Sequence, residues 1–188
     1  MKKYIKIGLI ILGGLALMFS LVYFAGNNVL PDLLGENNSS LSENTDTKLL
    51  DKKAPYFDLL DTSGERVRLD NFLNIPVVLV FWADWNKDSM DQIRILDDYL
   101  SLKSMQSSLV KIIAINSLDE SSVVKSIVRR GGYNVHFALD ITGDISNLYN
   151  VKSLPTTYFI DRDGVIKEIY GGILSSEMLM DKIDSLLR

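Results

Sequence analysis

Residues 77–89 read Val-Val-Leu-Val-Phe-Trp-Ala-Asp-Trp-Asn-Lys-Asp-Ser, and this stretch decides the fold. Its first six residues are all apolar, which is typical of a central parallel strand that is buried on both faces. A helical pattern follows from about Lys87. The apolar face of that predicted helix consists of Met90, Ile93, Leu96 and Leu100. A buried strand that leads directly into an amphipathic helix predicts an α/β domain.

Strand-like and helix-like segments alternate through the rest of the chain. Strands are predicted at 110–115 and 135–139, and helices at 121–130, at 145–149 and from about Ser176 onward. Two last strands, 156–160 and 165–170, are joined by Asp161-Arg162-Asp163-Gly164, and an Asp-Gly pair favours a hairpin. The crossovers require parallel strands and the hairpin requires an antiparallel pair. The sequence therefore predicts a mixed central sheet with helices on both faces.

The N-terminal part of the chain carries a membrane signal. Residues 7–25 contain no charged side chain, and as a helix they would span roughly 28 Å, close to the thickness of the hydrocarbon core. Residues 1–6 contain three lysines, and no Lys or Arg follows the apolar run before Lys48. The positive-inside rule then predicts a cytoplasmic tip over 1–6, a single-pass anchor over 7–25 in the cytoplasmic membrane, and an extracytoplasmic remainder. The alternative is a cleaved signal peptide, whose apolar core is usually shorter.

Composition divides the remainder into a linker and one domain. Residues 26–53 are rich in Asn, Ser, Asp, Glu and Thr, which predicts a flexible linker. Residues 54–188 are predicted to fold as one domain. The net charge of −4 argues against a surface that binds nucleic acid.

The chain has no cysteine and a single histidine, His136. These counts exclude disulfides, thiolate metal sites, cysteine nucleophiles and dithiol redox chemistry within the chain. His136 lies in an apolar stretch, so we interpret it as a packed histidine rather than a ligand. Asp140 and Asp144 lack the further oxygen ligands of a calcium loop, and a turn with a helix cap is the preferred interpretation. No metal and no cofactor are therefore expected.

Several motifs together resemble the thioredoxin-like superfamily, and more narrowly the membrane-anchored TlpA/ResA-like redoxin proteins. Ala54-Pro55-Tyr56-Phe57-Asp58-Leu59 resembles the start of the family's opening hairpin, and 77–85 resembles the strand that enters its active site. Residues 154–161 resemble the segment that holds the family's cis-proline, and 163–166 resemble its later hairpin. The resemblance covers residues 54–188. It implies a thioredoxin-like fold, a cis peptide bond before Pro155, and thiol-disulfide oxidoreductase activity linked to cell-envelope redox or cytochrome c maturation.

The chain departs from this family at the positions that carry the chemistry. The family places Cys-x-x-Cys directly after the tryptophan that matches Trp85, and this chain has Asn86 and Ser89 in those two places. The family's Glu, which takes part in proton transfer, is replaced by Gln92, and its following Pro by Arg94. Four linked positions differ together, so we interpret the domain as one that has left redox chemistry, and we predict no catalytic residue.

Three interpretations of the altered site stay open. In the first, Asn86, Asp88 and Ser89 only make a stable helix start, with the Asn86 side chain accepting a backbone N–H as an N-cap. In the second, they form a polar recognition site for a ligand carboxylate or a peptide. In the third, Ser89 is a nucleophile, although no base stands beside it in the sequence.

A peptide groove is the candidate binding site. The backbone beside the family's cis-proline pairs with an extended peptide through main-chain hydrogen bonds, which need no cysteine. The candidate groove residues are Trp85, Asn86, Ser89, Leu154 and Pro155. The alternative is that Pro155 only fixes the entry of a strand.

Three functions follow as hypotheses. The first is a non-catalytic binding module or pseudoenzyme that holds a peptide or protein partner in the cell envelope. The second is a divergent member of the thiol-disulfide oxidoreductase family, against which the absence of a thiolate argues. The third is a structural spacer without a ligand.

Overall fold

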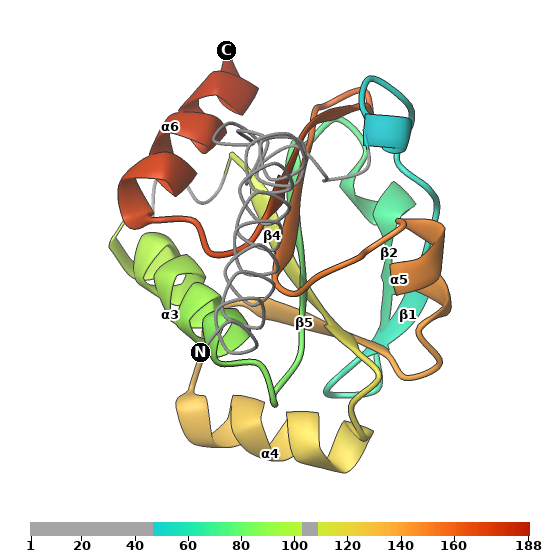
Figure 1. Ribbon diagram of the computed structural model, residues 1–188, viewed down its shortest axis with the longest axis vertical. Helices are drawn as coiled ribbons and strands as arrows, with labels where there is room; N and C mark the ends of the chain where they lie inside the picture. Colours follow the sequence, from blue (N-terminus) through green and yellow to red (C-terminus); the bar gives the residue numbers. More distant parts are fainter. Residues whose placement is uncertain (1–46, 103–108) are drawn as a thin grey trace, which may run out of the picture. The chain divides into compact units, whose positions relative to one another are not determined.

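The computed structural model describes residues 47–102 and 109–188 (Figure 1). The predicted tip (1–6), the predicted anchor (7–25) and residues 26–46 of the predicted linker lie outside the described residues. Within the two described ranges, no helix has both the length and the apolar character needed to cross a membrane.

One mixed sheet of seven strands organises the described residues, in the order β2-β1-β5-β4-β3-β6-β7. The strands are β1 (Asp58–Asp61), β2 (Arg66–Arg68), β3 (Val77–Trp82), β4 (Lys111–Ser117), β5 (His136–Asp140), β6 (Thr156–Ile160) and β7 (Ile166–Gly171). The helices are η1 (Thr47–Leu49), η2 (Leu69–Phe72), α3 (Lys87–Leu102), α4 (Ser121–Gly131), α5 (Asp144–Leu148) and α6 (Ser176–Leu187). β3 pairs with β4 in parallel and with β6 in antiparallel orientation, and β6 and β7 form the predicted hairpin.

Strand β3 is buried along its whole length because it supplies both cores of the domain. Its alternate side chains point to opposite faces of the sheet. One set packs with α3, α4 and α6, and the other packs with α5 and η2. Figure 1 shows α3, α4 and α6 on one side of the sheet and α5 on the other. The prediction of a mixed sheet with helices on both faces is confirmed.

The strand β4 extends beyond its predicted end, because polar residues continue its pairing with β5. The apolar pattern ends at Ile115, but β4 continues through Asn116 and Ser117. Asn116 pairs with Leu139 of β5, and its side-chain amide donates to Asp119 at 2.6 Å. A buried polar residue that is hydrogen-bonded in this way does not interrupt a strand.

The domain begins before Ala54, where the sequence placed its start. The Asp51 N–H donates to the carbonyl of Ile166, and the Ile166 N–H donates to the carbonyl of Lys52, both at 2.9 Å. Leu49 packs against the core on the α5 face. Residues 47–53 are therefore part of the folded domain rather than of a flexible linker. Main-chain hydrogen bonds do not depend on the type of side chain, so the polar composition of this segment could not reveal them.

Candidate functional site

The candidate site lies where β3 ends and α3 begins. Trp82 is the last residue of β3 and is fully buried, whereas Trp85 is 70% exposed. Trp82 therefore belongs to the buried strand, as the apolar run 77–82 predicts, and Trp85 lies at the surface. Because only two residues separate the tryptophans, the short connection fixes where the Trp85 backbone lies relative to the sheet.

Asn86 caps helix α3 as predicted. Its Oδ1 accepts the N–H of Ser89 at 2.8 Å, and its carbonyl accepts the N–H of Met90 at 3.2 Å. Asp88 lies in the first turn, where a negative charge complements the helix dipole. The positive end of α3 is thus satisfied by the chain's own groups, as the helix-start interpretation requires.

Ser89 and Gln92 are fully buried. The Ser89 Oγ has no hydrogen-bond partner among the described residues. Ser89 therefore lies beneath the predicted groove rather than on its wall, and its hydroxyl is not accessible for a nucleophilic role. Gln92, to which the sequence gave no role, accepts the N–H of Leu174 at 2.6 Å through its Oε1. This hydrogen bond holds the segment before α6 against α3. No local sequence pattern predicts it, because the two residues are 82 positions apart.

The peptide bond between Leu154 and Pro155 is cis, as the resemblance implies. Pro155 is buried, and its carbonyl accepts the N–H of Gly172 at 2.8 Å. Thr156 Oγ1 donates to the carbonyl of Ser153 at 2.7 Å and closes the turn. Within the described part of the chain, the N–H and C=O of Leu154 have no hydrogen-bond partner.

A pocket of about 270 Å³ opens between Trp85 and Leu154. Its other walls come from the end of β4 and from the region around α5, and include Leu118 and Gly143. The structure thus brings Trp85 and Leu154 together from positions far apart in the chain. Asn86, Ser89 and Pro155 are not among the residues that line this pocket. Leu118, which is 67% exposed, was missed by the sequence analysis.

Two carboxyl groups lie directly behind the Trp85 segment. Asp119 is almost fully buried, and its Oδ2 accepts the Asp84 N–H at 2.8 Å as well as the Asn116 side chain. Burial raises the pKa of Asp84, and the hydrogen bond and negative charge of the Asp119 carboxyl raise it further. The pair therefore links the end of β3 to the end of β4. Sequence reasoning missed it because 35 residues separate the partners.

Asp140 and His136 play the structural parts that the sequence predicted. The buried Asp140 carboxylate accepts the N–H of Ile145 at 3.2 Å and that of Ser146 at 2.7 Å, which caps the start of α5. His136 begins β5, and burial lowers its pKa. In the ranges 47–102 and 109–188, no group of three or more His, Cys, Asp or Glu side chains is arranged to hold a metal ion.

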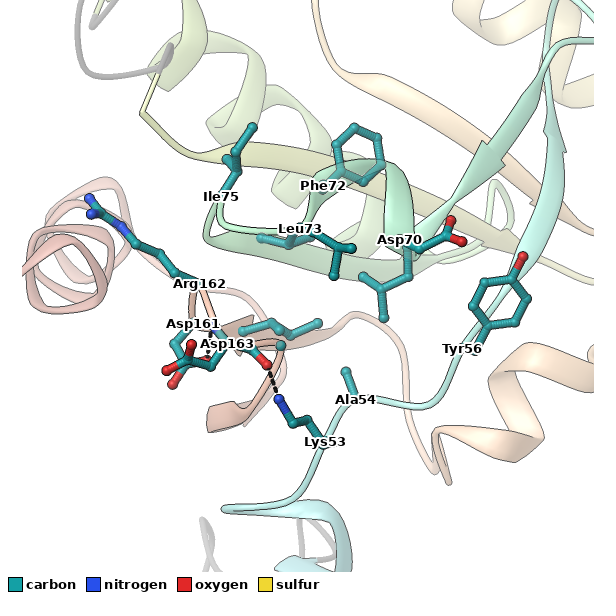
Figure 2. Close-up of a pocket in the computed structure, with 14 residues that line it drawn as sticks. Lys53, Ala54, Tyr56, Asp70, Phe72, Leu73, Ile75, Asp161, Arg162 and Asp163 are labelled. Atoms are coloured by element: carbon teal, nitrogen blue, oxygen red, sulfur yellow. Dashed lines mark hydrogen bonds between the residues drawn. The ribbon is translucent and has the colours of Figure 1, made fainter.

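A second pocket, of about 210 Å³, lies at the opposite end of β3 (Figure 2). Apolar side chains, including Phe72, Leu73 and Ile75, form much of its lining. At its edge the Lys53 ammonium donates to the main-chain carbonyl of Asp163. None of the predicted site residues lines this pocket. Its lining lacks the exposed tryptophan that the first pocket has.

Comparison with known proteins agrees with the resemblance. Residues 50–169 match the model of the AhpC/TSA family. The thiol-disulfide oxidoreductase ResA of Geobacillus kaustophilus is 29% identical over 133 residues, which cover 71% of this chain and 75% of that protein. ResA of Bacillus cereus is 32% identical over 121 residues, which cover 64% of this chain and 69% of that protein.

Solved structures show the same fold at lower identity. StoA from Bacillus subtilis superposes with a TM-score of 0.61 at 19% identity and covers 69% of this chain and 96% of its own. A thioredoxin-family thiol:disulfide interchange protein from Chlorobium tepidum gives a TM-score of 0.65 at 16% identity, covering 72% and 96%. The fold is thioredoxin-like. Since the family match spans more than half of the chain, this cysteine-free protein belongs to the AhpC/TSA family of redoxin domains.

Proposed function

We propose that this chain is a membrane-anchored, extracytoplasmic binding module, a pseudoenzyme that holds a peptide or protein partner in the groove beside Trp85. The carrying observation is the combination of a cysteine-free sequence with an exposed Trp85 and a free main chain at Leu154. Disulfide exchange needs a thiolate on the protein to form the mixed disulfide, and none of the 188 residues supplies one.

The helix start supports loss of catalysis rather than its replacement by another chemistry. Asn86 is engaged as a cap, and Ser89 is inaccessible. No activated nucleophile thus stands in the family's thiol positions. An extended peptide, in contrast, requires only main-chain donors and acceptors and an apolar contact surface, both of which lie at the groove.

The second candidate, a thiol-disulfide oxidoreductase, is favoured by the ResA relatives. Reduction of insulin by dithiothreitol in the presence of the purified full chain separates the two functions. We expect no acceleration by the natural chain. The control is the variant Asn86→Ser/Ser89→Ala, which changes the two positions that match the family's cysteines. Insulin reduction that is faster with the natural chain than with this variant would overturn the pseudoenzyme proposal.

Restoring the thiols tests how much of the redox geometry is left. We expect Asn86→Cys/Ser89→Cys to reduce a test disulfide, because both positions lie at the start of α3, directly after the connection from β3. An inert double variant that folds and titrates two thiols would show that the scaffold itself has been remodelled.

The proposed anchor and orientation need a separate experiment. Ser40→Cys in the linker, in this otherwise cysteine-free chain, gives a single target for a membrane-impermeant maleimide. We expect labelling in intact cells, and we expect Lys3→Cys to react only after lysis. Equal protection of both positions in intact cells would contradict an extracytoplasmic domain.

A further inference from the structure

The pocket lined by Trp85, Leu118 and Leu154 is here called the groove pocket. We infer that it binds an apolar side chain of an extended peptide, and that Lys152 forms an ion pair with an acidic residue close to that side chain in the peptide. This inference rests on the proposed binding function and specifies the class of its ligand.

Two large, exposed apolar side chains are among the residues that line the groove pocket. Trp85 and Leu118 both line it, at 70% and 67% exposure. Exposed apolar side chains that are gathered around one hollow mark a binding surface, whereas the same residues scattered singly carry no such meaning. An apolar side chain of a ligand would contact Trp85 and Leu118 together and remove both from water.

The backbone at Leu118 is held in a conformation that its side chain disfavours. Its φ is +68°, in the left-handed region that leucine rarely adopts. Gly143 lies directly under it, since a Cβ built at Gly143 would stand 2.8 Å from Cδ2 of Leu118. A leucine in this conformation, with its side chain 67% exposed, points to a function for that side chain beyond folding.

The lining of the groove pocket carries a positive charge. Lys152 is the single charged residue in its lining, is exposed, and forms no ion pair with the described residues. The hydroxyls of Ser117 and Ser146 in the same lining lie 2.7 Å apart and are occupied with each other, and Ser146 also bonds Asp140. The lining therefore combines the apolar side chains of Trp85, Leu118 and Leu154 with one ammonium that forms no ion pair among the described residues.

The free main chain at Leu154 favours a peptide as the ligand. Leu154 borders the groove pocket, and its N–H and C=O find no partner in the described residues. An extended backbone satisfies both groups in the way that strand addition does. A small apolar acid would leave them to water, so the main chain selects a peptide over such a compound.

Selection from a phage-displayed library of random heptapeptides on the immobilised full chain tests the inference. The expected consensus pairs Leu, Ile, Met or Phe with Asp or Glu one or two positions away. Lys152→Glu should reverse the charge preference to Lys or Arg, and Lys52→Glu, an exposed lysine outside the pocket lining, should leave the consensus unchanged.

Leu118→Asn separates binding from folding. Asparagine tolerates positive φ, so the midpoint of thermal unfolding should stay equal or rise, while the affinity for the most enriched peptide falls at least tenfold. A residue with a merely structural role would lower the thermal midpoint when replaced.

The outcomes distinguish the inference from the proposed function. Peptides that require Trp85, shown by loss with Trp85→Ala, but ignore Lys152→Glu and Leu118→Asn would overturn the inference and leave the binding module in place. No enrichment over a blank surface would overturn both. The apolar-acidic consensus with both variant effects would support both.

Discussion

The hydroxyl of Ser89 is buried without a hydrogen-bond partner among the described residues, directly below a helix cap that is complete without it. A buried, unpaired hydroxyl costs free energy, and its removal costs little packing. We expect Ser89→Ala to be neutral or to raise the free energy of unfolding by up to about 1 kcal/mol. Urea denaturation of both proteins measures this, and a loss of stability would indicate that the hydroxyl has a partner in solution.

Gln92 is the opposite case, because its side chain is the partner of a buried main-chain group. Leu174 is fully buried, and its N–H has the Gln92 Oε1 as its acceptor. Gln92→Ala leaves that N–H without an acceptor, so we expect a loss of about 1–3 kcal/mol in the free energy of unfolding. Asp98→Ala, at an exposed position of the same helix, is the matched control and should change it far less. Equal urea midpoints for the two variants would remove the structural role of Gln92.

Asp84 gives the stability of the domain a dependence on pH. Burial, followed by the Asp119 carboxyl, raises the pKa of Asp84 above its ordinary 3.8. The folded state thus holds this proton more tightly than the unfolded state. Its contribution to stability is complete below pH 3.8 and is lost as the pH rises through the raised pKa. We expect Asp84→Asn to gain stability relative to the natural chain as the pH rises above 3.8, as followed by thermal unfolding. A difference that does not change with pH would contradict the raised pKa.

At the scale of single elements, helix α3 depends on the residue that caps it. Asn86 supplies the side-chain acceptor at its N-terminus, and replacing an N-cap by alanine costs about 1 kcal/mol. We expect Asn86→Ala to lower the thermal midpoint by roughly 2–4 °C, and Asn86→Asp to keep it, since aspartate caps equally well. Ser175→Ala provides the comparison at α6, where the serine side chain accepts the Met178 N–H. An effect at Ser175 but none at Asn86 would show that α3 starts without its cap.

For the whole molecule, the start of the domain is the property to test. Residues 51–54 hydrogen-bond to the segment around Ile166, and Leu49 packs on the core. A chain that begins at Pro55 loses these contacts, each main-chain bond being worth about 0.5–1.5 kcal/mol. We expect it to unfold at a clearly lower temperature than a chain that begins at Thr47. Identical midpoints by calorimetry would restore the predicted linker boundary at Lys53.

By itself, the sequence determined what local patterns encode. The apolar run of β3, the periodicity of α3, the Asp-Gly hairpin and the Asn86 cap were all predictable, because each depends on neighbours within a few residues. The absence of any thiol, and with it the exclusion of dithiol chemistry, followed from composition alone.

Only the tertiary structure decided which distant residues meet. The bond from Gln92 to Leu174 spans 82 positions, and the contact of Asp84 with Asp119 spans 35. Leu118 lines the groove pocket only because β4 ends beside the Trp85 segment. Ser89 does not line it, because its side chain is buried. Burial, pKa and pocket shape depend on everything packed around a residue, and a one-dimensional pattern does not carry that information.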